Sequence, residues 1–422
     1  MKVFLDMVGC RLNQAEIERM ASQFRSLGHA IVPEAGEADL VVVNTCTVTS
    51  QAASDSRQKI RQAAKAGAKD VVVTGCWSTL QPAQAAALPG VIRVIPNDQK
   101  DHLVSELLQR PEHDFDVEPL ARVPLPGLRQ RTRAFIKAQD GCDNHCTFCI
   151  TTLARGESVS RPCVDVLADI RAALLGGAQE IVLTGVHLGA WGLDLESRLS
   201  TLIRRILDET KPPRLRLSSL EPWDLDEEFF TLWEDPRLCP HLHLPVQSGS
   251  VSTLKRMLRK TTPDSFRELV AAARKLIPDV AITTDVMTGF PGETDAEFNE
   301  TLDFIHEIEF AGGHVFSYSA RPGTPAARMK DQVPHKIRKI RNHILKGVFS
   351  EKATVYREKF ISRTLPVLWE SVTQVSDEGW RLEGWSGNYI RVKANSPEPR
   401  WNKVDNVKLI NLSSEGIQGE IV

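Results

Sequence analysis

Apolar runs alternate with stretches of helical periodicity along the first 110 residues. The strand-like runs are 3–5, 40–43, 71–73 and 91–95, and the helical stretches are 14–27, 51–66 and 103–108. Continuous β-branched runs between helices are typical of parallel strands that helices cover on both faces. The pattern therefore predicts an N-terminal domain, residues 1–110, built on a doubly wound parallel sheet.

A second alternation occupies residues 133–359. Its strand candidates are 134–138, 180–184, 214–218, 242–246, 281–286 and 314–318, with helical patterns between them. Six βα units of roughly 30–40 residues fit a partial (βα)6 barrel better than an open sheet. The chain is thus predicted to be a multidomain α/β protein.

Two further segments differ from these βα regions. Residues 111–132 carry four prolines among mixed charges, which predicts an interdomain linker. Residues 360–422 hold short strand-like runs interrupted by Gly and Pro, which predict a small all-β barrel.

The segment 328–359 is strongly basic, with ten Lys or Arg against three Asp or Glu. Apolar residues at helical spacing predict an amphipathic helix here. Its apolar stripe is Ile337, Ile340, Ile344, Val348 and Val355. The opposite face, with Lys336, Arg338 and Lys339, is either a solvated helix surface or a site for RNA phosphates.

Composition limits the class of protein. The chain has 422 residues and a formal net charge of −2, which excludes a globally cationic nucleic-acid binder but not a local basic face. No run approaches the roughly 20 apolar residues that span a bilayer, and Asp6 argues against a signal peptide. Eight cysteines are too few for a disulfide scaffold, so a cytoplasmic protein with reduced, metal-binding cysteines is expected.

Three cysteines lie close together at the start of the predicted barrel. Cys142, Cys146 and Cys149 follow its first strand, so they are expected at the C-terminal mouth, where barrel enzymes carry their chemistry. A four-cysteine zinc site needs one more ligand, and none lies nearby in the sequence. Three thiolates instead suit a [4Fe–4S] cluster with one open iron, which can chelate a ligand through an amine and a carboxylate.

Cys10, Cys46 and Cys76 form a second group. Each follows an apolar strand by a few residues, and the C-terminal ends of parallel strands share one edge of a sheet. We interpret the three as ligands of a second iron–sulfur cluster; the alternative is three ordinary buried thiols. Cys163 and Cys239 lack such partners and are expected to be structural.

The barrel spacing Cys-x3-Cys-x2-Cys is the signature of radical S-adenosylmethionine (SAM) enzymes. With a three-cysteine N-terminal domain and a C-terminal β-domain, the chain resembles the methylthiotransferase family over nearly its whole length. The matching motifs are Gly9-Cys10-x2-Asn13, Asn44-Thr45-Cys46, Thr74-Gly75-Cys76, 141–150, Arg155-Gly156, Ser160-Arg161-Pro162, 244–250, 289–293 and 321–326. The segments 180–187 and 218–222 resemble the threonylcarbamoyladenosine tRNA methylthiotransferase (MtaB-like) branch most.

The sequence departs from the family in two places. The family commonly has Pro where this chain has Thr152. The C-terminal domain resembles a TRAM RNA-binding domain but is not basic, with seven Lys or Arg and eight Asp or Glu over 360–422.

The resemblance implies a reaction, cofactors and partners. The reaction converts N6-threonylcarbamoyladenosine at tRNA position 37 into its 2-methylthio derivative by radical chemistry. The cofactors are two [4Fe–4S] clusters on the six grouped cysteines, and SAM on the barrel cluster with Phe148 near its adenine. Both clusters must face one cavity, so the C-terminal edge of the first sheet should face the barrel mouth. The partners are the tRNA anticodon stem-loop and an electron donor such as flavodoxin or ferredoxin, with no membrane.

Polar or small residues at the C-terminal ends of the barrel strands are candidates for SAM contacts. They include Thr184, Gly185, Ser218, Ser219, Glu221, Gln247 and Asp285. Gly185 would allow close backbone approach, and Glu221 or Gln247 would bond ribose hydroxyls; the alternative is that these groups only satisfy loop backbone. Arg155 and Arg321 are candidates for the SAM carboxylate or an RNA phosphate. No residue is assigned as a catalytic acid or base.

Other functions remain open from the sequence. The same chemistry can act on isopentenyladenosine 37 or on an aspartate of a small-subunit ribosomal protein. A different class is a non-catalytic iron–sulfur protein that binds RNA as a redox sensor or electron carrier. The polar residues at the barrel mouth favour an enzyme, because a carrier needs no SAM pocket.

Overall fold

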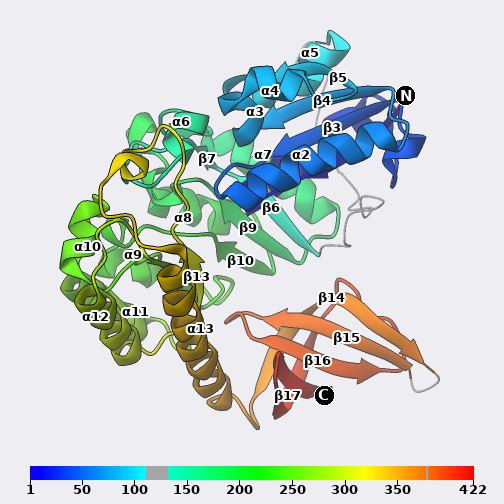
Figure 1. Cartoon of the computed structure of the whole chain (residues 1–422). Helices are drawn as coiled ribbons and strands as arrows, with labels where there is room; N and C mark the ends of the chain where they lie inside the picture. Colours follow the sequence, from blue (N-terminus) through cyan, green and yellow to red (C-terminus); the bar gives the residue numbers. More distant parts are fainter. Residues whose placement is uncertain (111–131, 377–378) are drawn as a thin grey trace.

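The computed structural model describes residues 1–110, 132–376 and 379–422. Figure 1 shows three parts in chain order: an N-terminal sheet with its helices, a central set of strands and helices, and a small C-terminal barrel. The predicted multidomain α/β fold is confirmed. Apart from Thr132, the predicted linker lies outside the described residues. Within the described part of the chain, no helix has the length and apolar character needed to cross a membrane.

The N-terminal part is a five-stranded parallel sheet in the order β2-β1-β3-β4-β5. Its strands are β1 (Lys2–Met7), β2 (Ala30–Ile31), β3 (Leu40–Thr45), β4 (Asp70–Gly75) and β5 (Val91–Ile95). Its helices are α1 (Arg11–Ser26), α2 (Ser50–Lys65), α3 (Cys76–Leu80), α4 (Pro82–Ala86) and α5 (Leu103–Leu108), with a 3-10 turn η2 (Asn97–His102) before α5. Helices α1 and α5 pack with Val42 on one face, and α2 packs with Val41 on the other. Helices therefore cover both faces of the sheet, because successive side chains of a strand point to opposite sides.

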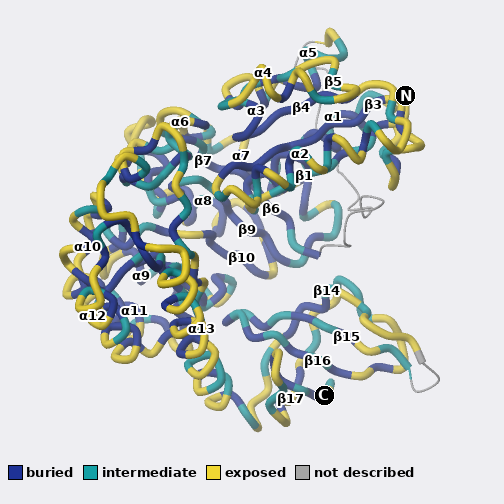
Figure 2. Tube along the Cα trace, in the orientation of Figure 1, coloured by how far each residue is buried: buried dark blue, intermediate teal, exposed yellow. Residues whose placement is uncertain are grey.

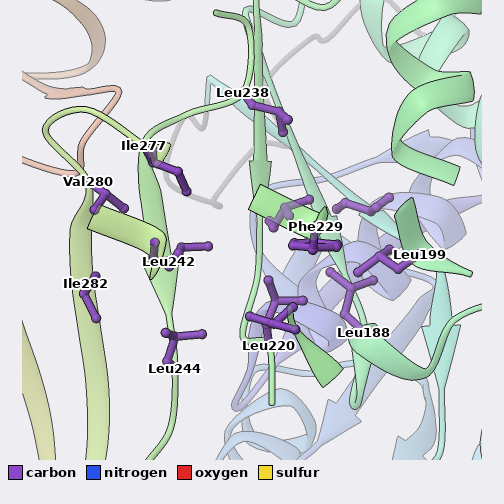
Figure 3. Packing of buried hydrophobic residues seen from close by; sticks show 14 of the residues in the cluster. Leu188, Leu199, Leu220, Phe229, Leu238, Leu242, Leu244, Ile277, Val280 and Ile282 are labelled. Atoms are coloured by element: carbon purple, nitrogen blue, oxygen red, sulfur yellow. The ribbon is translucent and has the colours of Figure 1, made fainter. Parts of the chain in front are cut away.

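The central part has six parallel strands divided into two sheets, β10-β9-β6 and β11-β12-β13. The strands are β6 (Arg133–Lys137), β9 (Glu180–Thr184), β10 (Arg214–Leu217), β11 (His241–His243), β12 (Ala281–Thr288) and β13 (Gly312–Ser317). The accompanying helices are α7 (Cys163–Leu175), α8 (Leu199–Glu209), α9 (Glu227–Phe230), α10 (Val251–Arg256), α11 (Pro263–Leu276) and α12 (Asp295–Glu307). A single hydrophobic core contains side chains from both sheets, including Leu242 and Leu244 beside Leu220 and Phe229 (Figure 3). The predicted partial barrel is present, with its hydrogen-bonded ladder interrupted between β10 and β11.

Helix α13 (His335–Glu358) connects the central part to the C-terminal barrel, but its orientation differs from the predicted one. Most of the predicted apolar stripe is exposed: Ile340 is 51% and Val355 56% accessible. The buried face instead consists of Arg341, Leu345, Val348, Phe349 and Tyr356. Tertiary contacts decide this rotation, because Arg341 pairs with the buried Glu293 at 2.5 Å and Phe349 fills the space beside Gly313.

The C-terminal part is a closed five-stranded barrel in the order β14-β15-β16-β18-β17, as the sequence predicts. Its strands are β14 (Thr364–Ser376), β15 (Gly379–Ser386), β16 (Arg391–Ser396), β17 (Val404–Ser413) and β18 (Gly416–Ile421). Buried and less buried residues alternate along β15 and β16 (Figure 2). The buried set, which includes Val367, Leu382 and Val392, fills the interior of the barrel.

Candidate functional site

Cys10, Cys46 and Cys76 lie at one edge of the N-terminal sheet. Cys10 precedes α1 after β1, Cys46 follows β3, and Cys76 begins α3 after β4. Because β1, β3 and β4 are adjacent parallel strands, their C-terminal ends lie side by side. The structure therefore brings the three cysteines to the same edge.

Glycines at two of these strand ends permit the cysteine loops to approach one another. Gly9 has a φ of +111°, and a Cβ atom on it would lie 2.7 Å from Cys46 Sγ. Gly75 has a φ of +101°, and a Cβ atom on it would lie 2.3 Å from the Thr45 carbonyl oxygen. Both positions need a backbone angle and a clearance that only glycine provides. The N-terminal cysteine site thus depends on close backbone packing around it.

The thiols of this site influence one another electrostatically. Burial, with the neighbouring Cys10 and Cys76, raises the pKa of Cys46 to about 11. Cys10 is accessible to solvent, yet the protein around it raises its pKa, and the Arg155 guanidinium opposes that shift. Such thiols become thiolates when a metal binds, because the metal charge displaces the proton.

Cys142, Cys146 and Cys149 occupy the loop between β7 (Gln139–Asp140) and α6 (Thr151–Arg155) at the barrel mouth. Backbone bonds shape this loop: the Cys142 N–H donates to the Gly156 carbonyl at 3.1 Å, and the Cys149 N–H to the Cys146 carbonyl at 3.0 Å. The hydroxyl of Thr152 donates to the Asn144 carbonyl at 3.3 Å. In this chain Thr152 therefore stabilises the cysteine loop from within.

Charged side chains flank the barrel cysteines. Arg259 Nη1 lies 3.8 Å from Cys146 Sγ, and Glu221 holds the same guanidinium at 2.6 Å. His187 Nε2 lies 2.6 Å from Asp224 Oδ2; burial opposes its protonation, but Asp224 and Cys142 raise the pKa of His187 to about 10. Burial raises the pKa of the Cys146 thiol, and the neighbouring Arg259 guanidinium opposes that shift.

Asn97 links the N-terminal cysteine site to the helix that follows the barrel cysteines. Its Nδ2 lies 3.6 Å from Cys76 Sγ and donates to the Ala154 carbonyl at 2.6 Å. Ala154 belongs to α6, five residues after Cys149. A single side chain therefore contacts a cysteine of the N-terminal site and the helix that follows the barrel cysteines.

Two arginines of the central part make the same connection. Arg155 donates to Asn13 Oδ1 at 2.7 Å, and Arg321 donates to Thr47 Oγ1 at 2.6 Å. The predicted arrangement, with the C-terminal edge of the first sheet facing the barrel mouth, is present. The sequence offered both arginines as ligands for the SAM carboxylate or an RNA phosphate; the structure uses both to hold the two parts together.

A buried ion network surrounds Glu16 of α1 at this interface. Its carboxylate accepts from Lys100 at 2.8 Å and from Arg155 at 2.9 Å, and Asn44 Nδ2 donates to it at 2.9 Å. Burial alone would raise the pKa of Glu16, but Arg155, Lys100 and Lys137 lower it well below its usual range. Glu16 is therefore a carboxylate that both parts of the chain neutralise.

The residues predicted to contact SAM lie around the barrel mouth, and several remain free to bind a ligand. Phe148 packs edge-on to Phe290, with 6.4 Å between ring centroids. Ser219 is exposed, and Gln247 is half-buried with a φ of +72°. Asp285 Oδ1 is buried without a hydrogen bond, although His243 Nε2 lies 3.3 Å away. Unpaired polar atoms at a barrel mouth are suited to a polar ligand.

Two of the predicted contacts already have protein partners. Glu221 is paired with Arg259, so a ribose hydroxyl would compete with that ion pair. A Cβ on Gly185 would lie 2.9 Å from Gln139 Oε1, so the protein itself occupies the space that this glycine provides. Arg259 and Glu16 were not identified from the sequence, because neither lies within a short motif that points to this chemistry.

No three His, Cys, Asp or Glu side chains within residues 1–110, 132–376 and 379–422 gather tightly enough to hold one metal ion. The cysteine groups are therefore not compact zinc sites. A four-iron cubane is larger than a single ion, so its thiolate ligands stand further apart.

Two family profiles match the chain. One, described as Uncharacterized protein family UPF0004, matches residues 2–95, and one, described as Radical SAM superfamily, matches residues 136–305. The first spans Cys10, Cys46 and Cys76, and the second spans the barrel cysteines. The radical SAM match implies a [4Fe–4S] cluster and SAM in the central part.

Several named proteins are similar over nearly the full chain. Threonylcarbamoyladenosine tRNA methylthiotransferase MtaB of Bacillus subtilis is 34% identical over 98% of this chain and 95% of its own length. The protein of the same name from Thermotoga maritima is 36% identical over 98% of this chain and 96% of its own length. The tRNA-2-methylthio-N(6)-dimethylallyladenosine synthase of Maricaulis maris is 31% identical, with 100% and 97% covered.

Among solved structures, the radical SAM methyltransferase TsrM from Kitasatospora setae, with cobalamin and a [4Fe-4S] cluster bound, superposes with a TM-score of 0.58. The match covers 77% of each chain at 16% identity, so it supports the fold alone. The sequence matches also support a family assignment, because they extend over all three parts of the chain. The protein therefore belongs to the methylthiotransferase family of radical SAM enzymes.

Proposed function

We propose that the protein is a tRNA methylthiotransferase that replaces the C2 hydrogen of N6-threonylcarbamoyladenosine at position 37 with a methylthio group. The observation that carries the proposal is the contact between the two cysteine sites through Asn97, which touches Cys76 and bonds Ala154. Joining a sulfur group to a carbon radical requires both reactants in one chamber, held at reacting distance. The contact of the N-terminal cysteine site with the helix that follows the barrel cysteines supports such an arrangement.

We assign the six cysteines to two cofactors. Cys142, Cys146 and Cys149 hold one [4Fe–4S] cluster, and Cys10, Cys46 and Cys76 hold a second. When bound, the barrel cluster with SAM would supply the radical that removes the unactivated C2 hydrogen, the N-terminal cluster would supply the sulfur, and another SAM would supply the methyl group. The convergence of three thiols at one sheet edge supports the second cluster.

The chain's own side chains bind, orient and balance charge. Phe148 offers an aromatic ring beside Cys149, and Asp285 offers a carboxylate, 3.3 Å from His243 Nε2, to a polar group of SAM. Ser219, Gln247 and Gly185 border the same mouth. Glu221 acts through Arg259, whose cationic group stands beside Cys146.

The choice of adenosine rests on the relatives. Two relatives named for threonylcarbamoyladenosine are 34% and 36% identical to this chain. Three relatives named for dimethylallyladenosine are 31%, 34% and 32% identical over 100%, 86% and 99% of this chain, which keeps the isopentenyl-type adenosine as the second candidate. Both candidates share the chemistry at C2 and differ only in the group on N6.

Nucleoside mass spectrometry of tRNA from a deletion strain tests the substrate. The 2-methylthio-threonylcarbamoyl nucleoside should disappear on deletion and return with the wild-type gene or with Cys163→Ala, which alters a cysteine outside both sites. Cys146→Ala should not restore it. Loss of the dimethylallyl derivative alone would transfer the assignment to the second candidate.

Iron and sulfide analysis of anaerobically prepared protein tests the cofactors separately. Two cubane clusters require about eight iron and eight sulfide per chain. Substitution of Cys10, Cys46 and Cys76 together should halve that content, and so should substitution of the barrel trio. A content of about four that depends only on the barrel trio would refute the second cluster.

We extend the proposal to partners and organisation. The exposed Lys336 and Lys339 of α13 supply phosphate contacts for the anticodon stem-loop, since the C-terminal barrel is not basic. A flavodoxin or ferredoxin supplies the electron, and the reaction takes place in the cytoplasm, with tRNA. We place the domain divisions at 1–110, 133–359 and 360–422, with 111–132 as the linker.

A further inference from the structure

The loop between β15 and β16 inserts into the base of the central barrel. Arg214 Nη1 donates to the Trp385 carbonyl at 2.9 Å, and Arg216 Nη1 donates to the Gly387 carbonyl at 2.9 Å. Both arginines come from β10, and both pair with the buried Glu180 of β9. The C-terminal barrel is thus attached to the end of the central barrel opposite the cysteine loop.

Tyr389 is the residue of this loop that reaches into the central barrel. Its ring stacks on His241 of β11, with centroids 4.5 Å apart and planes 14° apart. Trp385 stacks on the same ring at 4.6 Å, and the Arg216 guanidinium lies 5.0 Å from its centroid. Aromatic stacking and cation–π contacts therefore fix the ring from several directions.

The backbone of Tyr389 is held in an unfavourable conformation. Its φ is +62°, a region that bulky residues rarely adopt. The turn is secured by the Ser386 N–H, which donates to the Ile390 carbonyl at 3.0 Å, and by the Ser386 hydroxyl, which donates to Asn388 Oδ1 at 2.6 Å. The surrounding contacts hold Tyr389 in this rare conformation. Strain that is maintained in this way is characteristic of a functional constraint.

The Tyr389 hydroxyl connects this loop to the N-terminal cysteine site. It accepts a hydrogen bond from Arg11 Nη2 at 2.8 Å. Arg11 is the first residue of α1 and directly follows Cys10. One hydrogen bond thus links the C-terminal barrel, through the interior of the central barrel, to the residue beside a proposed cluster ligand.

We propose that Tyr389 is a positioning residue that holds Arg11, and through it the Cys10 backbone, in the geometry that the N-terminal cluster requires. The inference rests on the proposed function, because the cluster must exist for its geometry to matter. Residues that orient metal ligands affect metal retention strongly, although they never touch the metal.

The test isolates the N-terminal cluster. In a Cys142→Ala, Cys146→Ala, Cys149→Ala background, Tyr389→Phe removes only the hydroxyl and keeps the stacked ring. We expect iron loss to a chelator about tenfold faster, together with a changed electron paramagnetic resonance spectrum of the reduced cluster. Arg11→Met should do the same, and the double variant should be no worse than either single variant, because both remove one interaction.

Tyr356→Phe is the matched control. Its hydroxyl donates to the Asp279 carbonyl at 2.8 Å and accepts from Asn388, so it also anchors the C-terminal barrel but does not contact Arg11. A general loss of docking would affect both tyrosine variants equally and would overturn the inference. So would unchanged iron retention and an unchanged spectrum in Tyr389→Phe.

Amide hydrogen exchange of the apoprotein gives a readout independent of iron. Exchange at residues 8–14 should be faster in Tyr389→Phe than in Tyr356→Phe. If the background protein retains no iron even with Tyr389 intact, the proposed two-cluster function fails. If iron is retained but neither exchange nor spectrum responds, the positioning role alone fails.

Discussion

The Glu16 carboxylate and the Arg155 guanidinium form an ion pair at 2.9 Å in which both side chains are almost fully buried, at 1% and 2% accessibility. Glu16 lies in the first helix, and Arg155 ends the helix that follows the barrel cysteines. The same guanidinium bonds Asn13. The relative position of the two cysteine sites therefore depends on a charge pair contributed by both parts of the chain.

Arg155→Met is expected to destabilise the protein by about 3–5 kcal/mol, because removing one partner of a buried pair leaves the other uncompensated. Arg155→Lys should restore only part of the lost stability, because a lysine ammonium lacks the planar guanidinium group that donates to Glu16 and Asn13 together. The shift in the urea midpoint measures the effect. Arg205→Gln, which breaks an exposed pair with Glu209, is the control and should leave the urea midpoint nearly unchanged. Equal shifts of the urea midpoint in Arg155→Met and Arg205→Gln would show that the buried pair contributes no more to stability than the exposed pair.

Gly75→Ala should disrupt the N-terminal site much more than Gly67→Ala. Both glycines have a positive φ, +101° and +94°, so both substitutions strain the backbone. Only Gly75 has backbone atoms of Thr45 within 2.4 Å of an added Cβ, whereas Gly67 has nothing within 4 Å. Iron content after anaerobic reconstitution should fall by about half in Gly75→Ala, to the content of one cluster, and stay unchanged in Gly67→Ala. Full iron in both variants would contradict the tight packing described here.

Glu180→Gln should destabilise the base of the central barrel by about 3 kcal/mol near neutral pH. Burial alone would raise the pKa of Glu180, but Arg214 and Arg216 lower it to about 2. A carboxyl with a lowered pKa stabilises the fold above its unfolded value, 4.5, and loses that contribution as the pH falls toward 2. The stability difference between wild type and variant, measured on apoprotein, should therefore be constant from pH 7 to about 5 and shrink only at lower pH. A difference that already shrinks between pH 7 and 6 would assign the effect to another group.

Lys336→Gln with Lys339→Gln should weaken tRNA binding and lower the magnitude of the salt slope by about 1–2, since each lost phosphate contact contributes about 0.7–0.9. Arg338 is left out because it is half-buried and bonds the Tyr318 carbonyl, so it is not available to a phosphate. Binding measured over a series of salt concentrations gives the slope. Lys65→Gln, on the exposed side of α2, is the control and should leave it unchanged. An unchanged slope in the double variant would place the RNA on another face.

The sequence predicted those features that local patterns encode. The β-branched runs 40–43 and 71–73 became β3 and β4, and the cysteines after them met at one edge because parallel strands end together. The strand β2 was not predicted, since a two-residue strand leaves no periodic signal.

Features that depend on contacts distant in sequence were not predictable in the same way. The rotation of α13 is set by Arg341 with Glu293, which are 48 residues apart. Arg259 reaches Cys146 across 113 residues, and Arg155 reaches Glu16 across 139. No periodicity or short motif records such pairs, because only the folded chain brings them together.

The shared neutralisation of Glu16 has a consequence for how the protein can be divided. A fragment that stops at residue 110 keeps Lys100 but loses Arg155 and Lys137, two of the three cations around that carboxylate. It also uncovers Ala15, which packs against Phe135 and Val182 of the central part. Residues 1–110 are therefore no autonomous module, because helix α1 owes part of its buried surroundings to side chains that lie beyond residue 132.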